Sequence, residues 1–200
     1  PTLFAEGDRL GMFWLTRDEI LHALDAADPA PLEPHRVECE APGIARIIRG
    51  FDGLEALGFL GERFYITVEA KEDTTMAGFL LCGVHDSAHD EVRIDMTKLT
   101  AIPLGLNIPN IAEESLIIDG ERIITLSEAN GRNLTTTPRA KVFDAQANYL
   151  GALPMPAIEY RVTDATALDD QGRFWVINYF WPGEKDKLRP AADPEIARHG

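Results

Sequence analysis

Acidic side chains recur at equivalent positions of this 200-residue chain, and their type suits metal or proton chemistry. Glu55, Glu114 and Asp164 each stand near the start of an apolar run, while Glu69 and Glu128 follow the next such run. Two carboxylates about 6 Å apart repel by roughly 3 kcal/mol at an effective dielectric of about 20, so converging acids take up protons or a cation. Oxygen ligands favour Ca²⁺ before Mg²⁺ or Mn²⁺. Alternatively, these acids cap hairpins, bind turn amides or face solvent.

The acids belong to a sequence repeat. Residues 54–70 align without a gap with residues 113–129, at an offset of 59, and residues 164–178 give a third copy whose turn is one residue longer. Gly7, Asp8 and Arg9 mark a fourth turn before another apolar run. Each copy combines a short apolar strand, a tight turn containing glycine, and a second strand rich in β-branched and aromatic residues. This pattern predicts β-hairpins.

Further strand-like runs lie between the hairpins, at 76–84, 91–96, 140–144 and 149–153. About four strands per repeat is typical of a β-propeller blade, whose innermost strands converge on one axis. We therefore predict an all-β chain of about three and a half to four four-stranded blades, forming a single domain or a fragment of one. The expected blade-like units are approximately 1–48, 49–108, 109–158 and 159–200. Residues 17–27 are compatible with a short amphipathic helix, but we favour a blade strand at 20–24.

Both ends of the sequence indicate a piece of a longer propeller. Only six residues precede the first turn, and the chain becomes polar and rich in proline towards Gly200. We expect the remaining blades of the parent chain to be the partners of this segment, because an open arc of blades leaves sheet faces uncovered.

Charge and cysteine content exclude some function classes. The chain has 19 Lys and Arg against 33 Asp and Glu, a formal net charge of −14 that repels nucleic acids and anionic membranes. No apolar stretch is long enough to predict a membrane span. Secretion or a periplasmic location is an expectation only if a leader has been removed. Cys39 and Cys82 form no metal motif, and one disulfide between them is compatible with the sequence.

Other notable residues have structural interpretations. Arg63, Arg122 and Arg173 occupy equivalent hairpin turns, where we expect them to pair with the turn or a neighbouring blade. The segment 85–90 contains two histidines, but its small residues favour a hairpin tip over a metal site. The aromatic residues of segment 180–183 are expected to pack between blades rather than to cover a ligand.

Several segments are similar in sequence to those of one family of repeat proteins. They are residues 51–57, 114–116, 127–130, 138–144 and 160–168. They resemble the phytase-like group described as esterase-like activity of phytase, and more distantly the gluconolactonase-type propellers. The resemblance implies a six-bladed propeller with a divalent cation, Ca²⁺ first, at the mouth of the channel.

The resemblance also implies roles for the repeated acids. Glu55, Glu114 and Asp164 would be the metal ligands, and Glu69 or Glu128 the general base, in a hydrolase of small phosphoesters or lactones. The sequence departs from the gluconolactonase pattern at Glu55 and Glu114, where neither a following Gly-Pro nor an Asn-Gly pair is present. The alternative function is a non-catalytic propeller that binds a small molecule or a protein and holds only structural calcium.

Overall fold

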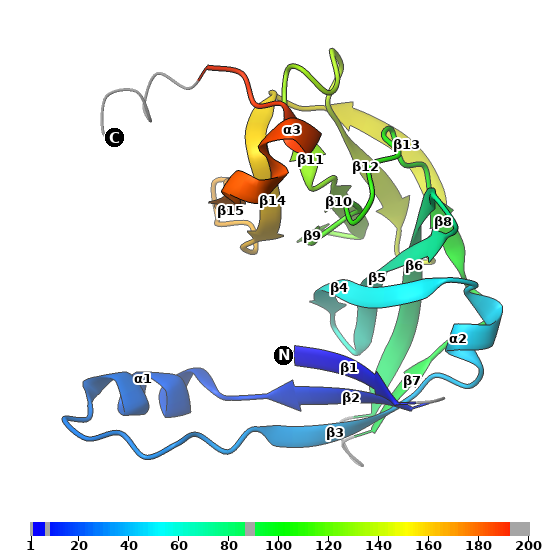
Figure 1. Cartoon of the computed structure of the whole chain (residues 1–200). Coiled ribbons are helices and arrows are strands. Elements are labelled where there is room, and N and C mark those ends of the chain that lie inside the picture. Colours follow the sequence, from blue (N-terminus) through cyan, green and yellow to red (C-terminus); the bar gives the residue numbers. More distant parts are fainter. Residues whose placement is uncertain (1, 7–8, 87–90, 193–200) are drawn as a thin grey trace.

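The computed structural model describes residues 2–6, 9–86 and 91–192, and the chain is built mainly of β-strands arranged in three sheets (Figure 1). This confirms the predicted all-β class. Each sheet has two edges, and none closes on itself within the described ranges.

The largest sheet combines the N-terminal strands with the first long hairpin. It runs in the order β1 (Thr2–Glu6), β2 (Arg9–Trp14), β3 (His35–Glu40), β7 (Glu91–Ile94), β6 (Thr75–Asp86), β5 (Arg63–Glu72) and β4 (Phe51–Leu60), and β8 (Thr100–Ile102) also pairs with β6. β3 and β7 are parallel neighbours, whereas the other pairs are antiparallel. The expected units 1–48 and 49–108 therefore share one sheet.

Two smaller sheets follow. The second is an antiparallel meander of β9 (Ser115–Asp119), β10 (Arg122–Leu126), β12 (Arg139–Asp144) and β13 (Tyr149–Pro154). The third consists of β11 (Ala129–Asn130), β14 (Ile158–Ala165) and β15 (Val176–Tyr179). The strand predictions at 76–84, 91–96, 140–144 and 149–153 are confirmed by β6, β7, β12 and β13.

Glycine shapes the two aligned hairpins. Gly61 and Gly120, which are 59 residues apart, stand at the first position of two-residue turns and have φ of +61° and +60°. Glycine adopts this left-handed conformation without the steric cost that a Cβ imposes, so the turns between β4 and β5 and between β9 and β10 close tightly.

The preference for a strand at 20–24 is wrong, because α1 (Arg17–Asp25) is a helix. Its start is a capping box: Thr16 Oγ1 accepts from the Glu19 N–H at 3.1 Å, and the Glu19 carboxylate accepts from the Thr16 N–H at 2.7 Å. This reciprocal pair satisfies two backbone N–H donors that the start of a helix otherwise leaves without partners. The remaining short helices are α2 (Ile44–Ile47), η1 (Pro182–Glu184) and α3 (Lys185–Leu188).

The first strands of the three hairpins lie next to each other. β4 packs beside β9, and β9 beside β14, on the inner side of the arc that the sheets form in Figure 1. Gly58 permits the first approach, because a Cβ at this position would collide with Leu116. Apolar side chains fill both junctions, with Tyr65, Leu80 and Phe143 in one and Ile117 and Val162 in the other. This packing places β9 between β4 and β14.

The hairpin arginines have the predicted structural contacts. Arg63 Nη1 donates to the Ala145 carbonyl at 2.8 Å and so joins the first sheet to the second. Arg122 pairs with Asp119, and Arg173 pairs with Asp169 at 2.8 Å, each across its own turn. These contacts confirm a structural role for all three side chains.

The remaining sequence expectations concern the cysteines, the histidines and the membrane. Cys39 and Cys82 are free and buried in different clusters, so the disulfide is absent from this structure. β6 and β7 are antiparallel neighbours on either side of the expected hairpin tip at 85–90, and residues 87–90 lie outside the described residues. The helices of the described chain are all too short to cross a membrane.

Candidate functional site

A β-bulge places the first of the repeated acids. In the pairing of β4 with β5, Glu55 and Ala56 together oppose the single residue Thr67. Thr67 Oγ1 accepts from the Ala56 N–H at 2.9 Å and donates to the Glu113 carbonyl at 2.7 Å, so the bulge is fixed to the chain just before β9. Bulges redirect side chains beside functional sites. Gly53 leaves room for the result, because a Cβ there would lie 2.7 Å from Glu55 Oε1.

Glu69 on β5 is a buried carboxylate without a full set of partners. It is 4% exposed, and its Oε1 has no hydrogen-bond partner among the residues that the structure describes. Burial raises the pKa of Glu69 to about 7, and the negative charges of Glu55, Asp52 and Glu114 act in the same direction. The carboxyl group therefore changes its protonation close to neutral pH.

Glu55 and Glu114 belong to the same cluster as Glu69. Burial raises the pKa of Glu55, and the charges of Glu114 and Asp52 raise it further. Burial also raises the pKa of Glu114, against the opposing effect of Arg161. The charge of Glu114 acts on both Glu55 and Glu69, so the structure brings the three carboxyl groups together, as the repeated acids predict.

Arg161 on β14 is the main cation of this region. Its guanidinium group forms ion pairs with Glu114 at 3.1 Å, with Glu184 at 3.1 Å, and with Glu128. The Arg161 side chain is 13% exposed, and the Glu128 side chain is fully buried. Arginine suits this role because its planar fork offers five donors and stays charged when buried.

The chain after β15 supplies the outer part of the cluster. Glu184 at the end of η1 lies beside Arg161, and Lys187 in α3 donates to Glu184 Oε1 at 3.0 Å. The two short helices thus connect to β14 through charged side chains. We define the acidic centre as these carboxylates and cations: Asp52, Glu55, Glu69, Glu114, Glu128, Arg161, Glu184 and Lys187.

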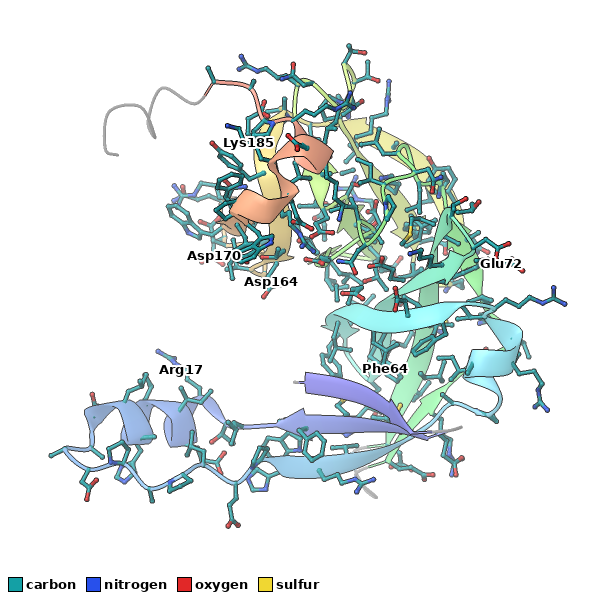
Figure 2. The ribbon with its side chains drawn as sticks, viewed as in Figure 1. Arg17, Phe64, Glu72, Asp164, Asp170 and Lys185 are labelled. Carbon is teal, nitrogen blue, oxygen red and sulfur yellow. The ribbon has the colours of Figure 1, made fainter. Side chains whose placement is uncertain are left out.

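Asp164 is not part of the acidic centre. It is exposed near the end of β14 (Figure 2), and its carboxylate accepts from the Ala165 N–H at 2.7 Å. The pairing of β14 with β15 shifts register between Val162 and Asp164. Arg161, three residues earlier on β14, reaches the acids, whereas Asp164 lies beyond this register shift near the end of the strand. The expectation that Glu55, Glu114 and Asp164 share a centre therefore fails at its third member.

Two other polar residues at strand ends are structural. Asn130 Nδ2 donates to the Ser127 carbonyl, and Asn178 Nδ2 donates to the Glu159 carbonyl at 2.7 Å. Both amides thus satisfy backbone acceptors. Glu128 Oε1 forms an ion pair with Arg161, and its Oε2 has no hydrogen-bond partner among the described residues.

The acidic centre contains more negative than positive charge. With every group ionised, the six carboxylates and the two cations Arg161 and Lys187 leave an excess of four negative charges. Protons or a bound cation must offset part of this excess. Oxygen donors suit a hard ion such as Ca²⁺, but within the described part of the chain no three His, Cys, Asp or Glu side chains are already grouped to hold a metal.

Sequence reasoning missed Arg161, Glu184 and Lys187. Arg161 lies between Tyr160 and Val162 in the middle of β14, and a charged residue between two such side chains in a strand signals a buried ion pair. Glu184 and Lys187 lie in a polar stretch after the repeat, where nothing in the spacing connects them to β14.

Comparison of the chain with protein-family models, curated proteins and solved structures finds no match. The phytase-like resemblance therefore stays a prediction, and the argument for function depends on the geometry of the acidic centre.

Proposed function

We propose that the sheets are blades of a β-propeller and that the acidic centre lies where their inner strands meet. The second sheet supports this as an antiparallel meander in chain order, and β4 to β7 repeat the same order within the first sheet. The contacts of β4 with β9 and of β9 with β14 are those expected between inner strands of successive blades. Six blades are the expected full ring.

The proposed function is that of a divalent-metal-dependent hydrolase acting on small phosphoesters or lactones. The observation that carries it is Glu69, a buried carboxylate with an unpartnered oxygen among other acids and a pKa raised to about 7 by burial. Burying an unpaired carboxylate destabilises a fold, and perturbed groups of this kind concentrate at functional sites. A bound cation would offset the excess charge.

Each residue of the acidic centre has a role in this proposal. Glu55 and Glu114 would hold the cation, Ca²⁺ first, with Asp52 at the exposed side. A cation there polarises a carbonyl or phosphoryl oxygen of the substrate. Glu69 acts as general base, because a group whose pKa is close to neutral both accepts and releases a proton readily. Arg161 positions Glu114 and holds Glu128 in place.

Thermal melting in Ca²⁺ and in EDTA tests the cation. Ca²⁺ at 100 times its dissociation constant stabilises the folded state by about 2.7 kcal/mol, which raises Tm by roughly 5–10 °C for a chain of this size. Glu55→Gln should abolish the shift. Asp164→Asn is the matched control, because Asp164 is exposed and outside the acidic centre, and it should retain the shift. A wild-type Tm that is equal in Ca²⁺ and EDTA contradicts the proposal.

Turnover tests the chemistry separately. The wild type should hydrolyse at least one compound from panels of small phosphoesters and lactones. Glu69→Gln should lose that activity by about 100-fold or more, as expected for removal of a general base, and should keep its Ca²⁺-dependent rise in Tm. Equal turnover by Glu69→Gln and wild type contradicts the role of Glu69.

A second candidate function is that of a non-catalytic binding module. The observation in its favour is that Arg161 already engages Glu114, Glu128 and Glu184, an arrangement that fixes β14 to its neighbours without any ligand. Retention of the Ca²⁺ shift with no turnover on either panel favours this module over the hydrolase.

A further inference from the structure

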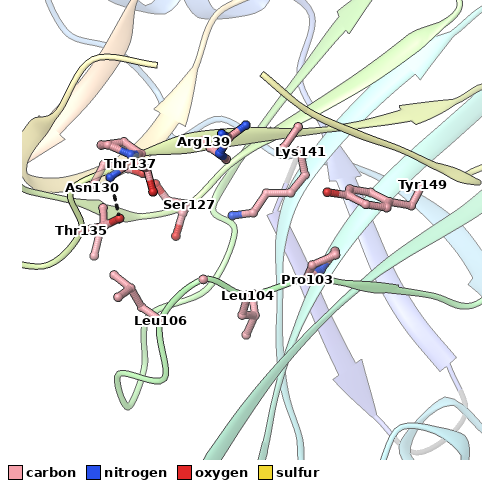
Figure 3. Close-up of a pocket in the computed structure, with 14 residues that line it drawn as sticks. Pro103, Leu104, Leu106, Ser127, Asn130, Thr135, Thr137, Arg139, Lys141 and Tyr149 are labelled. Carbon is pink, nitrogen blue, oxygen red and sulfur yellow. Dashed lines mark hydrogen bonds between the residues drawn. The ribbon is translucent and has the colours of Figure 1, made fainter. Parts of the chain in front are cut away.

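A pocket lies behind the acidic centre, at the second sheet. Its volume is about 330 Å³, and it is enclosed by the segment 103–106 after β8, the end of β10, and strands β12 and β13. Figure 3 shows polar side chains from these elements directed into one space. The polar groups at its wall are those of Ser127, Asn130, Thr135, Thr137, Lys141 and Tyr149. Leu104 and Leu106 provide an apolar side.

Lys141 brings a buried ammonium group to this pocket. The side chain is 7% exposed, and Nζ donates to Glu113 Oε1 at 2.6 Å. Glu113 is 1% exposed and balances the lysine charge. Because an ammonium group has three donors and Glu113 takes one of them, Lys141 retains donors for a further acceptor.

Arg139 adds an unbalanced positive charge to the same wall. It lines the pocket and is exposed, and its side chain has no ion pair or hydrogen bond with any residue that the structure describes. The chain has 33 acidic residues against 19 basic ones, so an arginine without a carboxylate beside a cavity is notable. The pocket thus combines a free guanidinium group, a lysine and several hydroxyl donors, the set of groups that binds an oxyanion.

Adjacent residues of the same segments face different sites, one the pocket and the next the acidic centre. Glu113 faces Lys141, whereas Glu114 faces Arg161. In the connection from β10 to β11, Ser127 lines the pocket, whereas Glu128 faces Arg161. The two sites therefore have opposite charge and different side chains, and binding in the pocket requires no metal.

We propose that this pocket binds a small organic oxyanion, with its phosphate or carboxylate group at Arg139 and Lys141 and its apolar part against Leu104 and Leu106. The volume suits a ligand of roughly the size of a substituted benzene ring, at the lower end of the range for small-molecule sites. This site is independent of the proposed hydrolase activity.

Isothermal titration calorimetry in EDTA tests the proposal with phenyl phosphate, benzoate and benzyl alcohol. We expect saturable binding of at least one of the two anions, tighter than that of the neutral alcohol, and the tighter anion identifies the head group. Arg139→Gln should weaken this binding about tenfold or more, because it removes a charge-assisted hydrogen bond. Arg132→Gln is the matched control: Arg132 is exposed and outside the pocket, so affinity should be unchanged.

A second variant tests the location without removing a charge. Ala152→Phe on β13 should fill the pocket and abolish binding of the anion, with circular dichroism showing that the fold is retained. The proposal is overturned if neither anion binds saturably at millimolar concentration. It is also overturned if Arg139→Gln and the folded Ala152→Phe variant bind as the wild type does. Since EDTA is present throughout, failure here leaves the metal proposal unaffected.

Discussion

The acidic centre has two sides that differ in how their carboxylates are balanced. On the side of β14, Arg161 forms ion pairs with Glu114, Glu128 and Glu184, and Glu128 is fully buried beside it. On the side of β5, Glu69 is similarly buried but faces Glu55 and Asp52, which are also acids. Two buried carboxylates in one cluster thus have opposite electrostatic environments.

The difference shows where a ligand can act. Glu128 is buried against its guanidinium partner and gains little from a new cation, whereas Glu55 and Glu69 lie among other acids and gain charge compensation from a proton or a metal. Glu114 belongs to both sides, because it pairs with Arg161 and its charge raises the pKa of Glu55 and of Glu69. The side of β14 is therefore a fixed scaffold, and the side of β5 is the responsive part. The variants below test this contrast, in decreasing order of their expected effect.

Arg161→Met should have the largest effect, because it leaves Glu114, Glu128 and Glu184 without their shared cation. Breaking a buried ion pair on one side typically costs about 3–5 kcal/mol of unfolding free energy. Urea denaturation at pH 7 measures this loss. Arg161→Lys keeps the charge but not the forked geometry, and it should lose less. Equal stability of Arg161→Met and wild type would show that the side of β14 is not a scaffold.

The Glu69 side should respond to pH. The pKa of Glu69 is 4.5 as its ordinary value and about 7 in the fold, where burial raises it. Below pH 4.5 both states bind the proton and no penalty exists. As pH rises from 4.5 to 7 the unfolded chain releases the proton first, so stability falls by up to roughly 3 kcal/mol and then levels off.

Glu69→Gln isolates this contribution. The variant should be more stable than the wild type at pH 8 and close to it at pH 4.5, as measured by urea denaturation in EDTA at both values. Glu72→Gln is a suitable control, because Glu72 lies on the same strand and is exposed. A difference between wild type and Glu69→Gln that does not change with pH contradicts the assigned protonation.

Thr67→Val should have an intermediate effect. The substitution keeps the shape of a side chain that is 1% exposed, but it removes the acceptor for the Ala56 N–H and the donor to the Glu113 carbonyl. We expect a loss of about 2 kcal/mol, and a weaker Ca²⁺ shift because the bulge no longer fixes Glu55. If the variant matched the wild type in both stability and Ca²⁺ shift, the bulge would not be what fixes Glu55.

Asp164→Asn should have the smallest effect. Asp164 is exposed and bonds only its neighbouring backbone N–H, so the change in unfolding free energy should stay within about 0.5 kcal/mol. Thermal and urea unfolding check this expectation. A large loss of unfolding free energy would contradict the exclusion of Asp164 from the acidic centre.

The hairpins and the long strands follow from local sequence. Gly61 and Gly120 mark turns 59 residues apart, and the apolar runs that follow them predict β6 and β7 after the first turn and β12 and β13 after the second. These features depend on backbone conformation and short-range alternation, which sequence records directly. The helix α1 could also be predicted, because Thr16 and Glu19 have the spacing of a capping box. The preference for a strand at 20–24 did not take this signal into account.

The acidic centre was predictable only in part. The repeat indicates Glu55, Glu69 and Glu114 because they occupy equivalent or neighbouring strand positions. It fails at Asp164, which lies beyond a register shift near the end of β14, and no local sequence signal marks that shift. Arg161 precedes the shift and forms the ion pairs with Glu114 and Glu128. Tertiary ion pairs of this kind depend on which faces meet, and the spacing along one chain does not contain that information.

The direct test of the account is the titration of the Glu69 carboxyl group by carbon-detected NMR, from acid to mildly alkaline pH, with assignment through Glu69→Gln. In EDTA we predict a midpoint near 7, because Glu69 is buried among acids. In Ca²⁺ the midpoint should fall by at least one unit, because a nearby cation favours the charged carboxylate. A midpoint near 4.5 in EDTA would contradict the account.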